Sequence, residues 1–167
     1  MFITLFVLIV FAVPLLIAAY TDFSTMKIPN KVSLAMAAGF FLTLPLHWQG
    51  LPVLGDHLLV GAFFLVAGFA MFAFGWLGGG DAKLMAAIGL WLGWPDMLPF
   101  ILYTTLFGAA LGVFLMLGSQ FMPIRLRTSS VGMRLFQGGS DMPYGLALAA
   151  GALFIWPSSQ INAALIG

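Results

Sequence analysis

Two aspartates, Asp22 and Asp81, are the residues of this chain whose type and setting best suit catalysis. The chain has only five acidic residues, and these two each lie where a long apolar run meets a short polar connection. Two carboxylates held together near a boundary of low dielectric constant can share one proton, so that one is a base and the other an acid. Such a pair suits peptide hydrolysis, because the base activates water while the acid donates to the developing oxyanion.

Each aspartate also has a structural interpretation. Asp22 can pair with Lys27 at the end of the first apolar run. Asp81 can serve as the N-cap that ends a flexible loop. Glycine lets a neighbouring chain approach closely, which favours a site over a simple loop at Asp81. The three glycines that directly precede it are Gly78, Gly79 and Gly80.

The other acids and the histidines have ordinary explanations. Asp56 and Asp96 are expected as solvated loop or helix-cap residues, and Asp141 lies among turn-forming residues. His47 and His57 fall in one connection and are interpreted as interfacial residues rather than as a metal site. The absence of cysteine excludes disulfides, thiolate metal sites and cysteine nucleophiles. We therefore expect no metal and no cofactor.

The composition places these residues in a membrane protein. Hydrophobic residues make up 62% of the chain and charged residues 7%, and the mean hydropathy is +1.11. A soluble domain needs a charged exterior, which so few charged residues cannot supply. No basic patch with interleaved aromatic residues is present, so we expect membrane lipids and no nucleic acid as partners.

Charged and turn residues divide the chain into six apolar segments, which predict an all-α integral membrane protein with a bundle of six transmembrane helices. Residues 1–167 are interpreted as a single transmembrane domain. The first segment lacks the basic start of a signal peptide, so it is expected to be a retained span. The expected helices cover residues 2–20, 32–46, 57–77, 82–94, 97–122 and 143–165.

The basic residues set the expected topology. They all follow the first, third and fifth segments, so the positive-inside rule makes those connections cytoplasmic and leaves both termini on the outer, periplasmic side. Asp22 and Asp81 are then expected on the same, cytoplasmic, side of the membrane. The basic residues are Lys27, Lys31, Lys83, Arg125, Arg127 and Arg134.

Local signals predict how several helices begin. Asn30 follows Pro29 and precedes an apolar run, so it is expected to be the N-cap of the second helix. Pro143 suits the first turn of the last helix. From Gly145 onward, small residues recur at four-residue spacing, which favours close packing against another helix.

Three motifs resemble those of one known family. The chain resembles the type IV prepilin peptidases, the GxGD-type intramembrane aspartyl proteases, and most closely their short form in tight-adherence (Flp) pilus systems. The motifs occur in the family's order, with the expected spacing between the aspartates. They are Asp22-Phe-Ser-Thr-Met-Lys27-Ile-Pro29-Asn30, Gly78-Gly-Gly-Asp81-Ala-Lys83 and Met142-Pro-Tyr-Gly-Leu-Ala-Leu-Ala149.

The resemblance implies that Asp22 and Asp81 are the catalytic pair. It implies as substrate a prepilin or pseudopilin with a basic leader, cut after a glycine that precedes a hydrophobic helix. The cut is expected at the cytoplasmic face of the bacterial inner membrane, with the pilus assembly machinery as a further partner. The residues expected to support the motifs are Gly78, Gly79, Gly80, Lys83, Lys27, Pro29 and Asn30.

The chain also departs from the longer members of that family. Those carry an N-terminal cytoplasmic region, often with paired cysteines, and also N-methylate the new pilin terminus. This chain starts with its first apolar segment and has no cysteine. We therefore expect peptidase activity without a zinc site, no N-terminal methyltransferase-type region and no methyltransferase activity.

Two other functions stay open. A small proton-coupled transporter would use the same aspartates as a proton relay. A non-enzymatic pilus or secretion assembly protein would explain the small-residue spacing but not the paired aspartates. Lys83 either favours the charged form of Asp81 or only marks the membrane interface. The connection 123–142 is interpreted as lying on the anionic leaflet, with substrate gating as the alternative.

Overall fold

The protein is all-helical in the part that the structure describes, a computed structural model covering residues 1–121, 132–133 and 142–166. This confirms the all-α part of the expected fold class. Arg125, Arg127, Arg134 and Asp141 lie outside the described residues, as does most of the connection 123–142. The helices are α1 (Phe2–Thr25), α2 (Asn30–Thr43), α3 (Leu51–Ala73), α4 (Gly79–Phe121), α7 (Tyr144–Ile155) and α8 (Gln160–Ile166), with 3-10 turns at Leu44–Leu46 and Trp156–Ser158.

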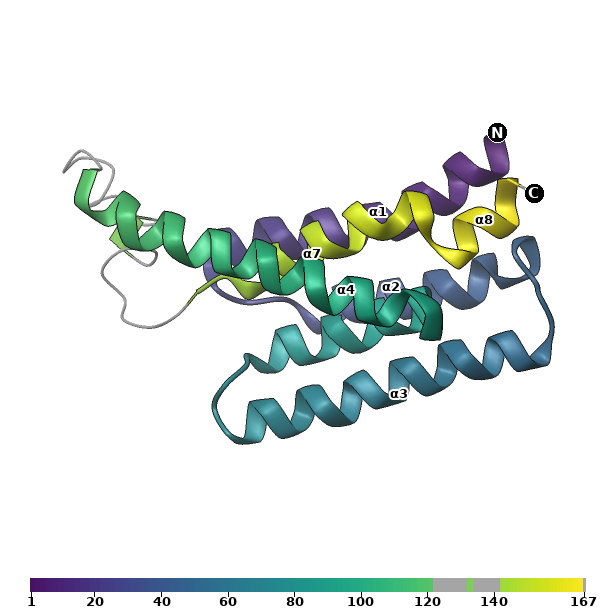
Figure 1. Ribbon diagram of the computed structural model, residues 1–167, viewed down its shortest axis with the longest axis horizontal. Coiled ribbons are helices and arrows are strands. Elements are labelled where there is room, and N and C mark those ends of the chain that lie inside the picture. Colours follow the sequence, from purple (N-terminus) through teal and green to yellow (C-terminus); the bar gives the residue numbers. More distant parts are fainter. Residues whose placement is uncertain (122–131, 134–141, 167) are drawn as a thin grey trace.

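The helices run lengthwise, so the bundle has two distinct ends (Figure 1). The end of α1 and the starts of α4 and α7 lie at one of them, and both chain termini lie together at the other (Figure 1). The helix α7 contacts both α1 and α4, while α3 packs against α4. The fold therefore gathers the ends of three separate helices at the end opposite the termini.

The long helix α4 reverses direction at Gly93 (Figure 1). This residue has φ 70° and ψ −172°, a conformation that is essentially restricted to glycine. A side chain would also be crowded, because a Cβ there would lie 3.0 Å from the ring of His57. The expected segments 82–94 and 97–122 correspond to the parts of α4 before and after this reversal. The backbone conformation of Gly93 is what separates the two parts.

Among the described residues, three helices are long and apolar enough to cross a membrane: Phe2–Thr25, Leu51–Ala73 and Gly79–Gly118, which contains the reversal. The segment Asn30–Leu46 is apolar but shorter. These helices support the prediction, made from the composition, that the chain is a membrane protein. The six-span count and the periplasmic termini stay predictions.

The helix α3 begins and ends earlier than the expected 57–77. Pro52 lies in its first turn, where a missing backbone N–H costs nothing. Gly75, at φ 73°, follows its end, and the N–H of Trp76 donates to the carbonyl of Met71 over 2.9 Å. A left-handed glycine together with a backbone hydrogen bond that spans five residues is a common way for a helix to end.

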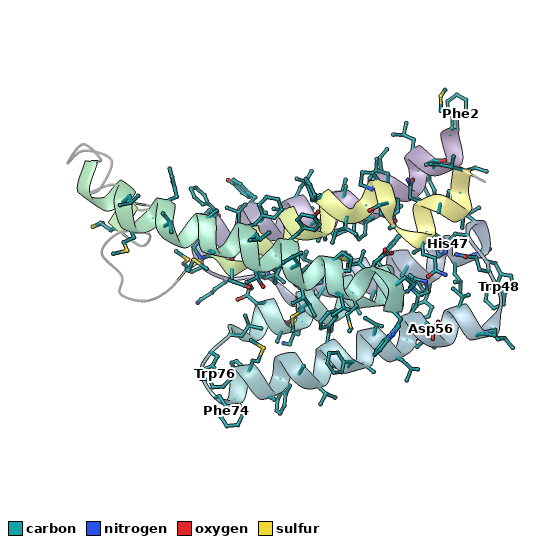
Figure 2. The ribbon with its side chains drawn as sticks, in the orientation of Figure 1. Phe2, His47, Trp48, Asp56, Phe74 and Trp76 are labelled. Carbon is teal, nitrogen blue, oxygen red and sulfur yellow. The ribbon has the colours of Figure 1, made fainter. Side chains whose placement is uncertain are left out.

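The interpretation of His47 and His57 as interfacial residues is wrong, because both side chains are buried. The early start of α3 carries His57 into the helix, where its Nδ1 lies 3.0 Å from the carbonyl oxygen of Leu90 in α4. Figure 2 shows His47 near the termini, at the opposite end from Trp76. Asp96 is a helix cap, since its Oδ2 accepts the N–H of Gln160 at the start of α8 over 2.9 Å.

The expected caps also differ. Pro29, at ψ 138°, is the N-cap of α2, and Asn30 is the first helical residue with no capping hydrogen bond. The extended conformation of the proline makes it the N-cap, so the helix begins at Asn30, one residue earlier than an N-cap at Asn30 would allow. Asp81 lies in the first turn of α4 rather than at its cap, because the helix begins at Gly79. Pro143 is the N-cap of α7 and not part of its first turn.

Candidate active site

A cavity of about 620 Å³ lies where α1 ends and α4 and α7 begin, and both Asp22 and Asp81 line it. The two aspartates come from separate helices and share this space. The other lining residues are apolar, aromatic or glycine, so the carboxylates are the only acidic groups among the lining residues that the structure describes. Those residues are Met26, Met71, Gly75, Trp76, Leu77, Gly78, Met142 and Tyr144.

Asp22 lies in the last turns of α1 and is only 5% exposed. Met26 adopts a left-handed conformation, with φ 54°, and its N–H donates to the backbone carbonyl of Asp22 over 2.8 Å. The carboxylate oxygen Oδ2 accepts the backbone N–H of Gly145 over 2.8 Å. The first N–H groups of a helix have no partner inside it, so the start of α7 offers a donor that Asp22 satisfies.

Asp81 lies in the first turn of α4 and is half-buried. Its oxygen Oδ1 is buried and has no hydrogen-bond partner among the residues that the structure describes. Buried polar atoms without a partner are rare in proteins, and they occur at catalytic sites among other places. No described protein group hydrogen-bonds Oδ1, and the residue Asp81 itself lines the cavity.

The three glycines before Asp81 have different surroundings. A Cβ at Gly78 would lie 2.7 Å from Oδ2 of Asp81, so this glycine leaves room for the carboxylate. A Cβ at Gly79 would meet only the ring edge of Phe72, at 3.3 Å. A Cβ at Gly80 would lie 3.0 Å from Cβ of Ile28 and 3.3 Å from its backbone. The first and third glycines therefore serve the site more directly than the second.

The hydrogen-bond partner of Lys83 in the described structure is Asn30 and not Asp81. Its Nζ donates to Oδ1 of Asn30 over 2.9 Å, which ties the start of α2 to the first turns of α4. Both residues are exposed. Lys27 is exposed too, and Asp22 is held by Gly145 rather than by an ion pair with Lys27 in the described structure. The second motif is thus linked to the first through a side-chain hydrogen bond.

Ile28 and the cavity-lining side chain of Tyr144 were not among the residues expected in the site, and Gly145 was expected only in helix packing. Ile28 is buried where α4 and α7 begin, and Gly145 holds a carboxylate oxygen. All three residues lie within the quoted motifs, so the motifs were the available signal. The motifs did not indicate which of their residues contact one another in the folded protein.

No metal centre accompanies this cavity in the part of the chain that the structure describes. Within residues 1–121, 132–133 and 142–166, no group of three or more His, Cys, Asp or Glu side chains is placed to hold a metal ion. The two carboxylates that line the cavity are groups that can carry out proton transfer.

The chain is similar to one family of known proteins. The Type IV leader peptidase family matches residues 9–113, a range that contains both cavity aspartates. No solved structure matches the chain significantly.

Curated relatives agree with that family. A protein of Xanthomonas campestris pv. campestris is 32% identical over 142 residues, which is 72% of this chain and 43% of the relative. A protein of Bacillus subtilis is 30% identical over 155 residues, 91% of this chain and 55% of the relative. Both are named prepilin leader peptidase/N-methyltransferase. The chain therefore spans about half the length of these relatives.

Proposed function

This chain belongs to the type IV leader peptidase family, and on that premise we propose that it is a membrane-embedded aspartyl endopeptidase that removes the leader peptide of prepilins. The observation that carries the proposal is the single cavity lined by Asp22 and Asp81. A peptidase without a metal or a nucleophilic side chain needs two carboxylates within reach of one peptide bond. The cavity supplies two from separate helices.

The proposed reaction uses the aspartates as a pair. The ionised carboxylate takes a proton from water as the oxygen of that water attacks the peptide carbonyl carbon. The protonated partner donates to the carbonyl oxygen, which yields a tetrahedral intermediate. The C–N bond then breaks as a proton passes to the leaving amine. The unpartnered Oδ1 of Asp81 and the fixed Oδ2 of Asp22 support such a division between a free and an anchored oxygen.

We place the cut at the cytoplasmic face of the bacterial inner membrane. Lys27, Lys31 and Lys83 lie in or beside the connections at the cavity end, and basic residues favour the cytoplasmic side. Trp76 is 74% exposed at the same end, where amphipathic rings suit a membrane interface (Figure 2). The substrate is a prepilin or pseudopilin with a basic leader.

The cut follows a glycine just before the substrate's hydrophobic helix. A helical substrate has to be locally extended before its carbonyl can be attacked, and glycine makes that extension easy. The names of the relatives include two activities, a prepilin leader peptidase and an N-methyltransferase. We propose only the peptidase for residues 1–167, because the cavity supports hydrolysis and the chain has no cysteine pair.

The test is cleavage of a purified prepilin by the purified protein in lipid, with the products identified by mass spectrometry. Asp22→Asn and Asp81→Asn should each abolish the shortened pilin. The matched control is Asp56→Asn, because Asp56 is an exposed aspartate at the opposite end of the bundle (Figure 2). Retained cleavage in either cavity variant would remove that residue from the mechanism. Proton flux that depends on Asp81, without any cleavage, would favour the transporter instead.

A further inference from the structure

The buried side chain of Ile28 lies where three elements meet. It packs on Gly80 at the start of α4, where a Cβ would lie 3.0 Å from Cβ of Ile28. It also packs on Gly145 at the start of α7, where a Cβ would lie 2.6 Å from Cδ1 of Ile28. The segment between α1 and α2 is therefore wedged between the two helix starts that border the cavity.

Gly145 makes two contributions at this junction. Its backbone N–H donates to Oδ2 of Asp22, and it has no side chain to keep the carboxylate away. A Cβ at this position would lie 2.9 Å from Oδ2 and 3.2 Å from Cβ of Asp22. Any other residue would have to displace Asp22, Ile28 or the start of α7.

We propose that Gly145 is a positioning residue that orients the carboxylate of Asp22 through its backbone N–H, and that Ile28 braces it against the start of α4. The inference rests on the proposed catalytic role of Asp22. Orientation matters there because a misplacement of about 1 Å can cost about 100-fold in rate. The bracing matters because Ile28 packs on the starts of both helices that begin at the cavity.

The chain offers a matched control in the same helix. A Cβ at Gly151 would clash with Oγ1 of Thr104 and lie 3.1 Å from its Cα, so Gly151→Ala disturbs the packing of α7 on α4. Gly151 has no contact with Asp22 among its close neighbours. A purely structural role for Gly145 predicts similar behaviour for Gly145→Ala and Gly151→Ala.

Kinetics and thermal stability together separate the two roles. Gly145→Ala should lower kcat by about 100-fold with little change in KM, whereas Gly151→Ala should lower Tm while the folded fraction keeps its kcat. Adding Ile28→Val to Gly145→Ala removes Cδ1 and should recover part of the Tm. It should not recover kcat, because the new methyl group still lies against Asp22. Recovery of kcat together with Tm would overturn the proposal, as would equal losses of kcat in the two glycine variants.

A second measurement does not depend on cleavage. In protein labelled with 15N-glycine, the amide signal of Gly145, identified by its absence in Gly145→Ala, should shift and exchange faster in Asp22→Ala. It should stay in place in the control Asp56→Ala. An unchanged Gly145 signal in Asp22→Ala would overturn the positioning role even if the enzyme cleaves prepilin. A protein that shows the shift but cleaves no prepilin would refute the proposed function alone.

Discussion

The backbone N–H of Gly145 donates to Oδ2 of Asp22 over 2.8 Å, across 123 positions of the sequence. This hydrogen bond joins the start of α7 to the end of α1. It also makes the third sequence motif part of the surroundings of the first aspartate, rather than only a helix-packing element. The cavity is therefore built from all three motifs.

The three glycines before Asp81 should respond differently to substitution by alanine. Gly78→Ala should reduce cleavage strongly, because its methyl group would lie 2.7 Å from Oδ2 of Asp81. Gly80→Ala should also reduce cleavage, because its methyl group would press on both the side chain and the backbone of Ile28. Gly79→Ala should keep most of the activity, because its nearest neighbour is the edge of the Phe72 ring. Initial rates of prepilin cleavage measure all three.

The glycine series is informative only if the variants fold. Melting temperatures and membrane yield should accompany each rate, and rates should be compared per folded protein. A Gly79→Ala variant as inactive as Gly78→Ala would mean that backbone freedom of the whole run matters more than the individual close approaches.

Lys83 and Asn30 should act as one unit in a double-mutant cycle. Breaking their hydrogen bond with Lys83→Met or Asn30→Ala should cost about 1 kcal/mol of stability, since a typical hydrogen bond contributes about 0.5–1.5 kcal/mol. The double variant should be no less stable than the worse single one. Denaturation of the purified variants in detergent measures this coupling. Fully additive losses would show that the two side chains act independently.

Gly93→Ala should destabilise the protein without touching the cavity. The backbone conformation at Gly93 costs a residue with a side chain about 1–3 kcal/mol, and the methyl group would also press on the ring of His57. Thermal unfolding followed by circular dichroism should show a lower Tm for Gly93→Ala. An unchanged Tm would mean that the reversal of α4 can adopt another conformation.

The two cavity aspartates should show strongly non-additive effects on catalysis. General acid and general base groups typically contribute about 100-fold to 10,000-fold each, but groups that act together lose most of their effect when either is removed. The double variant Asp22→Asn, Asp81→Asn should therefore cleave no more slowly than either single variant. Single-turnover rates with excess enzyme provide the measurement. A double variant whose loss is the product of the single losses would show that the aspartates work in separate steps.

Much of the architecture could be predicted from the sequence, since it depends on local properties. The apolar segments and the scarcity of charge predicted helices in a membrane, and the described structure has long apolar helices over the first and third segments and over the fourth and fifth together. The expected helix 143–165 is instead interrupted by the 3-10 turn at Trp156–Ser158. The boundaries were less predictable. The end of α3 depends on the left-handed conformation of Gly75, and the start of α2 depends on the extended conformation of Pro29. The order of residues near each boundary did not specify these conformations.

The histidines show where sequence reasoning fails and why. His47 and His57 lie among polar and turn residues, which suggested an interface, but both are buried in the bundle. The burial of His57 depends on a carbonyl oxygen in α4 that lies 33 positions away in the sequence. No pattern local to α3 contains that information.

Composition and residue order are properties of the chain, so they were enough to predict a membrane protein and to select the two aspartates with the motifs around them. Three contacts could be learned from the folded protein alone: Asp22 accepts the N–H of Gly145, Lys83 donates to Asn30, and both aspartates line one cavity. These relationships join residues from separate helices. They exist only once packing has set the relative positions of those helices, which is why neither spacing nor residue type could specify them.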